Sequence, residues 1–144
     1  MKSISRKAFL SNTCKAACVL AGGSAFLTLL EGCAPFKVYS TKTQDGILSV
    51  PLAEFATEKS RIVRDNNLDS DIFLSKTETG YIALKMKCTH QDWLLTATGS
   101  GFACSSHGST FATDGKVTNG PATEPLKQLK TIVTNTTIQI YLNQ

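Results

Sequence analysis

The sequence predicts an all-β domain that follows a short N-terminal leader. Three observations support this prediction: residues 34–144 alternate apolar and polar residues in short runs, they contain no convincing amphipathic helix, and turn residues separate the runs. The chain has 144 residues, of which 42% are apolar and 18% charged, which suits one compact soluble domain. Many short strands in a domain of this size indicate stacked antiparallel sheets or a small barrel.

Residues 1–33 have the composition of an export signal. Positions 2–15 are basic and polar, and positions 16–30 form an uncharged, mainly apolar stretch of 15 residues. A membrane-spanning helix needs about 20 such residues, whereas the core of a signal peptide needs roughly 7–15. We therefore expect residues 1–33 to be a signal peptide and residues 34–144 to be the folded domain. A buried first helix is the alternative.

Two motifs refine this expectation. Residues 5–10 (SRKAFL) resemble a twin-arginine export signal with Lys7 in place of the second arginine, and residues 29–33 (LLEGC) resemble a bacterial lipoprotein processing site. At such a site Cys33 would become the lipidated N-terminus, although Glu31 is unusual there. The alternative is that Cys33 only follows an uncleaved anchor. In both cases we expect a membrane-anchored domain on the periplasmic or extracytoplasmic side of a bacterial membrane.

The expected domain carries almost no net charge. The chain has 15 basic and 11 acidic residues, and residues 1–33 hold four of the basic and one of the acidic ones, which leaves 11 and 10. A nearly neutral domain has no electrostatic basis for binding nucleic acid. We therefore expect no nucleic-acid partner.

The alternating runs give the expected strands in chain order. In residues 81–87 the larger apolar side chains share one face and two lysines lie on the other, so this strand should pair with residues 71–75 across a turn at 77–80. Turn residues stand at 45–46, 99–101, 114–115 and 119–121. The expected strands cover residues 47–50, 61–64, 71–75, 81–87, 93–96, 101–104, 116–118, 130–134 and 137–142.

Both histidines of the chain, and both cysteines beyond residue 33, fall in two short clusters. Cys88 and His90 follow the strand at 81–87, and Cys104 and His107 follow the next expected hairpin. The pattern is C-x-H, then 13 residues, then C-x-x-H. A thiolate and an imidazole one or two residues apart can both face one centre, so the pattern predicts a metal site.

Three interpretations of these clusters remain open at this level. A disulfide between Cys88 and Cys104 suits an exported protein, but it leaves the pairing of each cysteine with a histidine unexplained. Tetrahedral zinc is chemically sound, although zinc fingers usually place both cysteines in one cluster and both histidines in the other. The mixed clusters suit a centre with two irons, because both thiolates can bind one iron and both imidazoles the other.

These motifs resemble those of the Rieske [2Fe-2S] family. The resemblance covers roughly residues 37–142 and rests on residues 88–90 (CTH), 104–111 (CSSHGSTF), 119–122 (NGPA) and 125–126 (PL). It implies stacked antiparallel sheets with a small cluster-binding subdomain, and one [2Fe-2S] cluster per chain. It also implies that Cys88 and Cys104 bind the inner iron, and His90 and His107 the outer, solvent-facing iron.

The resemblance assigns further roles around the cluster. Ser109 would donate a hydrogen bond to a bridging sulfide, or else act as a simple turn-capping serine. Gly120 and Pro121, with Ala122, would form a proline loop that covers the cluster. Trp93, Leu94, Leu95 and Phe111 would form either an apolar rim for a transient partner or plain core, with core favoured for Phe111.

The sequence also departs from the family pattern. The spacer of 13 residues is somewhat short, which implies a trimmed hairpin. Quinol-oxidising members have a second cysteine pair where this chain has Trp93 and Ser106, and high-potential members have a hydrogen-bonding tyrosine where it has Phe111. Fewer donors stabilise the added electron less. We therefore expect a potential in the lower or middle part of the Rieske range of about −150 to +300 mV.

The function that the resemblance implies is one-electron transfer in an exported, membrane-tethered protein. We expect an electron carrier or oxidoreductase subunit, without substrate turnover of its own, that exchanges electrons with protein redox partners. The alternatives are the Rieske subunit of a quinol-oxidising cytochrome complex and the small subunit of a molybdenum oxidoreductase. From a different class, a zinc-stabilised β module for binding is a further alternative.

Overall fold

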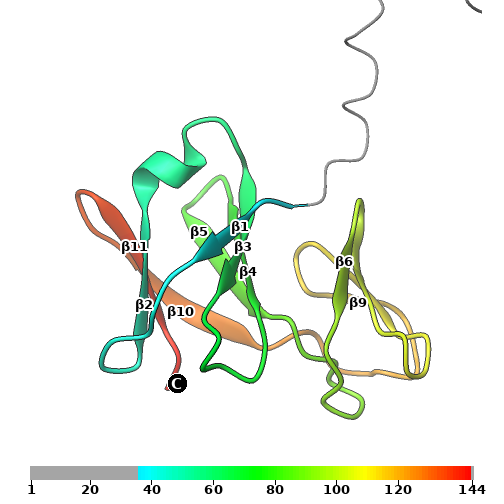
Figure 1. Cartoon of the computed structure of the whole chain (residues 1–144). Helices are drawn as coiled ribbons and strands as arrows, with labels where there is room; N and C mark the ends of the chain where they lie inside the picture. The colour runs from blue at the N-terminus through cyan, green and yellow to red at the C-terminus, as the bar shows by residue number, and fades with distance from the viewer. Residues whose placement is uncertain (1–35, 144) are drawn as a thin grey trace, which may run out of the picture. The chain divides into compact units, whose positions relative to one another are not determined.

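The computed structural model describes residues 36–143, which form eleven β-strands and one short 3-10 helix (Figure 1). The predicted signal peptide and Cys33 lie outside the described residues. In the part that is described, no helix is both long enough and apolar enough to span a membrane.

Seven strands form the larger sheet, in the order β1-β3-β4-β5-β10-β11-β2. Neighbours are antiparallel except β1 and β3, which run parallel. β10 belongs to both halves of this sheet, because its first residues pair with β5 and its last four pair with β11. The strands are β1 Val38–Ser40, β2 Ile47–Pro51, β3 Ser60–Arg64, β4 Ile72–Lys76, β5 Tyr81–Lys85, β10 Gln128–Val133 and β11 Thr137–Tyr141, and the 3-10 helix Leu52–Phe55 follows β2.

The second sheet has four short antiparallel strands in sequential order (Figure 1). They are β6 Thr96–Thr98, β7 Gly101–Ala103, β8 Thr110–Ala112 and β9 Val117–Asn119. This sheet lies between β5 and β10 in the chain, so it is an insertion into the larger sheet. We call residues 88–126, which contain it, the small subdomain.

Two apolar cores stabilise the domain. The first lies within the larger sheet and its helix and is built around fully buried residues such as Leu48, Val63 and Ile140. The second joins the two sheets: Phe73 of β4 meets Phe102 of β7 edge to face, with ring centroids 5.0 Å apart. Edge-to-face aromatic pairs contribute about 0.5–1.5 kcal/mol beyond the area that they bury.

The predicted all-β class is confirmed, and most strands lie where alternation places them. The strand expected at 93–96 lies instead at Thr96–Thr98, so Trp93 and Leu94 belong to a loop. The strand expected at 81–87 ends at Lys85, although the Met86 N–H still donates to the carbonyl of Asp71, the residue opposite it. The sequence analysis missed β1, β8 and the 3-10 helix, whose three or four residues are too few to show a period.

Candidate metal centre

The first cysteine–histidine cluster lies in a tight loop after β5. In this first ligand loop, residues 88–93, the Cys88 N–H donates to the Trp93 carbonyl (2.7 Å) and the Asp92 N–H donates to the Cys88 carbonyl (2.8 Å). Asp92 has a positive φ of 58°, a conformation that short polar residues tolerate. The loop therefore closes around Cys88 and leaves His90 exposed.

The second cluster repeats this hydrogen-bond pattern. In the second ligand loop, residues 104–109, the Cys104 N–H donates to the Ser109 carbonyl (2.8 Å) and the Gly108 N–H donates to the Cys104 carbonyl (3.1 Å). Gly108, four residues after the cysteine as Asp92 is in the first loop, also has a positive φ, of 78°. Two loops of one shape, each starting at a cysteine, therefore hold the four predicted ligands.

The structure brings these ligands together as two pairs. Cys88 and Cys104 are 2% and 3% exposed, and neither forms a disulfide. His90 and His107 are exposed, and their ring centroids lie 5.0 Å apart at an angle of 86°. Within residues 36–143, no three His, Cys, Asp or Glu side chains form a group that could hold one metal ion. Two sulfur donors inside and two nitrogen donors outside fit two irons that share bridging sulfides.

The surroundings of Cys104 favour its thiolate. Burial raises the pKa of this thiol. Hydrogen bonds from the Ser106 N–H, the Cys88 thiol and the His107 N–H together lower it by more than burial raises it, so the pKa lies below its ordinary value. The thiolate is the form that binds metal. The side chain of Ser106 contacts the other ligand of this loop, with its Oγ 3.2 Å from Nδ1 of His107.

The segment after β9 lies against the second ligand loop. Ser109 is fully buried, and its Oγ accepts a hydrogen bond from the Ala122 N–H (3.0 Å). A hydroxyl has a single proton, which this contact leaves free to be donated. Gly120 and Pro121 precede Ala122, are exposed, and are joined by a cis peptide bond. We call residues 119–125 the proline loop.

Two residues at this site were missed by the sequence analysis. The Thr89 hydroxyl donates to the Glu124 carbonyl (2.7 Å), and the Asn119 side-chain amide donates to the carbonyls of Gly108 (3.1 Å) and Gly120 (3.0 Å). Both residues lie inside matched motifs, which was the available signal. The carbonyls of Glu124 and Gly108 are distant in the sequence from the side chains that bind them, so no local pattern reveals these contacts.

Of the four residues predicted to form either an apolar rim or core, two are exposed and two are buried. Trp93 and Leu94 are 57% and 60% exposed, next to the first ligand loop, whereas Leu95 and Phe111 are buried. Buried Phe111 belongs to the same core as both cysteines. Of these four residues, Trp93 and Leu94 therefore supply the exposed apolar surface, and both are close in sequence to His90.

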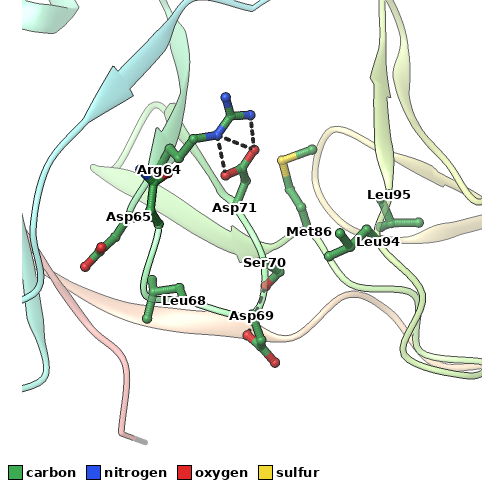
Figure 2. Close-up of a pocket in the computed structure, with 10 residues that line it drawn as sticks. Arg64, Asp65, Leu68, Asp69, Ser70, Asp71, Met86, Leu94 and Leu95 are labelled. Atoms are coloured by element: carbon green, nitrogen blue, oxygen red, sulfur yellow. Dashed lines mark hydrogen bonds and ion pairs between the residues drawn. The ribbon is translucent and has the colours of Figure 1, made fainter.

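A hollow of about 350 Å³ lies beside Leu94 and Met86 (Figure 2). Three of its charged side chains are in ion pairs: Arg64 bonds to Asp71 through two nitrogens, and Asp69 accepts from Lys85 and Lys87. The fourth, Asp65, accepts hydrogen bonds from the backbone N–H groups of Thr43 and Asn67. Hydrogen bonds from Lys87 and then Lys85 lower the pKa of Asp69 to about 2. These pairs fix the surface next to the first ligand loop.

Comparisons with known proteins concern the family and the fold of the chain. The sequence model of the Rieske [2Fe-2S] domain matches residues 51–130. The crystal structure of the plasma membrane Rieske protein PetC3 from the cyanobacterium Synechocystis PCC 6803 is similar, with 23% identity, a TM-score of 0.51, and coverage of 65% of this chain and 97% of that one. At this identity the likeness concerns the fold alone.

A weaker similarity links the chain to an oxygenase–ferredoxin complex of carbazole 1,9a-dioxygenase. The identity is 19% and the TM-score 0.48, with coverage of 68% of this chain and 94% of the matched chain. No curated protein sequence matches the chain.

Proposed function

Because the chain belongs to the Rieske [2Fe-2S] domain family, we propose that it is an exported, membrane-tethered electron carrier whose cluster is held by Cys88, His90, Cys104 and His107. A Rieske domain binds a [2Fe-2S] cluster, which supplies one-electron oxidation and reduction. In this assignment Cys88 and Cys104 hold the inner iron, and His90 and His107 hold the outer one.

The burial of the four side chains carries this proposal. Both cysteines lie within the core that joins the two sheets, where water has little access, and both imidazoles lie at the surface. Buried thiolates are protected from competing oxidants and metals. Exposed imidazole edges give a docked redox partner the shortest path to the centre.

Trp93 and Leu94 supply apolar contact area next to those edges. Both are more than half exposed; Trp93 is the last residue of the first ligand loop and Leu94 follows it. Transient electron-transfer contacts are small, so two large apolar side chains beside the imidazoles are a sufficient anchor. The partners in this proposal are protein redox partners, and the domain needs no substrate pocket of its own.

Ser109 and the proline loop complete the proposed environment. The Ser109 hydroxyl is buried, is held by the Ala122 N–H, and keeps its proton for a bridging sulfide. Gly120 and Pro121, with Ala122, would then cover the cluster. These roles follow from the family pattern together with the observed contacts.

Export and tethering rest on the sequence of residues 1–33. We propose that these residues are a signal peptide, that residues 34–144 are the Rieske domain, and that Cys33 carries lipid on the periplasmic or extracytoplasmic side of a bacterial membrane. Mass spectrometry of the mature protein tests this. The expected N-terminus is a lipid-modified Cys33, whereas an intact Met1 would contradict processing.

The ligand set is tested on the full chain by iron and sulfide analysis and electron paramagnetic resonance. We expect two irons and two sulfides per chain, and loss of the reduced-cluster signal in His107→Ala and Cys104→Ser. Ser105→Ala is the matched control, because this exposed side chain lies in the same loop. An unchanged spectrum in His107→Ala, or zinc in place of iron, would contradict the assignment.

A subunit role in a quinol-oxidising or molybdenum-containing complex is the second candidate. The interloop disulfide of quinol-oxidising members has no counterpart here, since Trp93 and Ser106 stand at the matching positions and neither is a cysteine. A redox titration separates the candidates, because the measured potential limits which donors and acceptors can exchange electrons with the domain. We expect the lower or middle part of the range of about −150 to +300 mV.

A further inference from the structure

The two ligand loops of this chain have no covalent bridge between them. Cys88 and Cys104 are the free cysteines of the described domain, and Trp93 and Ser106 cannot form a disulfide. Each loop follows a different strand, so relative motion of the loops would separate the two cysteine sulfurs. Something else must hold the loops in register.

The proline loop contacts both ligand loops through side chains. At its start, Asn119 uses its amide group twice: one bond reaches Gly108 in the second ligand loop, and the other reaches its own neighbour Gly120. Gly108 directly follows His107. The amide therefore fixes the distance between a proposed iron ligand and the beginning of the proline loop.

The end of the proline loop is fastened to the first ligand loop. The Thr89 hydroxyl donates to the Glu124 carbonyl over 2.7 Å, and Thr89 stands between Cys88 and His90. Between the two ends, the Ala122 N–H donates to Ser109. The proline loop is thus tied at its start and middle to one ligand loop and at its end to the other.

We propose that Asn119 and Thr89 are positioning residues that fasten the proline loop across both ligand loops and so replace a covalent bridge. Neither side chain needs to touch the cluster for this role. Each side chain holds a backbone carbonyl of a neighbouring loop by a hydrogen bond. The loops therefore separate less often, and water reaches the cysteines less often. The inference rests on the ligand set proposed above.

The test compares Thr89→Val, Thr89→Ser and Asn119→Ala in the full chain. Valine matches threonine in shape but removes the donor, whereas serine keeps the donor. We expect Thr89→Val and Asn119→Ala to lose iron to a chelator up to about tenfold faster, the equivalent of one lost hydrogen bond. Thr89→Ser should keep the wild-type rate. Thr123→Val is the control, because Thr123 is an exposed threonine of the proline loop.

A second measurement uses the cluster-free chain. Amide hydrogen exchange across residues 104–109 and 119–125 should speed up in Thr89→Val and Asn119→Ala, while exchange in β2 and β11 stays as in wild type. Wild-type rates in both measurements, or a defect in Thr89→Val that Thr89→Ser shares, would overturn the inference. If wild-type protein binds no cluster, the ligand assignment fails, and the exchange experiment still decides whether the fastening exists.

Discussion

Phe111 stands at a position from which a polar side chain could reach the two cysteines. It is 2% exposed and packs in the core that contains Cys88 and Cys104. A phenylalanine there offers no hydrogen bond, so it leaves the thiolates electron-rich and disfavours a further negative charge.

We therefore expect Phe111→Tyr to raise the reduction potential. One added hydrogen bond of about 1 kcal/mol corresponds to about 40 mV for a single electron. Voltammetry on wild type and variant measures the difference, and thermal unfolding checks that the ring is still accommodated. A potential that stays the same or falls, in a variant that folds normally, would show that the new hydroxyl donates elsewhere.

Ser109→Ala should act in the opposite direction. The substitution removes a buried hydroxyl that accepts from Ala122 and, in our proposal, donates to a bridging sulfide. We expect the potential to fall by about 40 mV, since one donor worth about 1 kcal/mol is lost. Ser105→Ala, in the same loop but exposed, should leave the potential unchanged.

At the scale of elements, the β7–β8 hairpin sets the second ligand loop, because one strand leads into Cys104 and the other starts after Ser109. Its tightest point is Gly101, where an added Cβ would lie 2.0 Å from the Phe111 carbonyl oxygen. The two backbones can approach this closely only because Gly101 has no side chain.

Gly101→Ala should therefore destabilise the domain by about 2 kcal/mol, the typical cost of overpacking against an immobile group. Denaturant unfolding measures the change. Gly99→Ala, two residues away in the turn between β6 and β7, meets nothing within 4 Å and should change stability by less than about 0.5 kcal/mol. Equal effects of the two substitutions would contradict this account of the hairpin.

At the scale of the whole molecule, the two cores differ in whether they contain predicted ligands. The core of the larger sheet contains no predicted ligand, whereas the core between the sheets includes Cys88 and Cys104. A bound cluster stabilises only the state in which its ligands are assembled. Removal of iron should therefore loosen the small subdomain more than the larger sheet.

Hydrogen exchange with and without the cluster measures this difference. We expect faster exchange in the ligand loops and the proline loop of the iron-free chain, and little change in β2 and β11. A uniform increase over all strands would show that the two cores unfold as one unit.

The stability of the domain should also depend on acidic pH through Asp65. Its carboxylate accepts from the N–H of Asn67 and the N–H of Thr43, contacts that hold the loop after β3 against the loop after β1. These hydrogen bonds, that of Asn67 first, lower the pKa of Asp65 to about 2. A lowered pKa means that the stabilisation is complete above about pH 4 and is lost as the pH falls toward 2.

Asp65→Asn should accordingly lower the melting temperature by a few degrees at pH 7. The difference in melting temperature between variant and wild type, which we call the gap, should narrow as the pH falls toward 2. Thermal unfolding across this range measures the gap. Glu78→Gln, at the exposed turn between β4 and β5, is the control and should follow wild type throughout. A gap that stays constant with pH would show that the carboxylate charge is not the cause.

The sequence by itself determined the all-β class, most of the strands and the family. Strand alternation is a local property of the side chains, and the C-x-H, C-x-x-H and NGPA motifs are short contiguous segments. The alternation and the motifs are therefore visible without coordinates. The prediction that Trp93 lies in a strand was wrong, because an apolar run in a loop looks like a strand until its hydrogen-bond partners are known.

Only the tertiary structure decided how those segments meet. It placed the cysteines in the core and the histidines outside, showed that the two ligand loops share one hydrogen-bond pattern, and brought the proline loop onto both through Asn119 and Thr89. These contacts join residues far apart in the chain to backbone carbonyls, which every residue possesses. Which carbonyl each side chain binds therefore depends on the packing of the two sheets, and no local pattern of side chains encodes it.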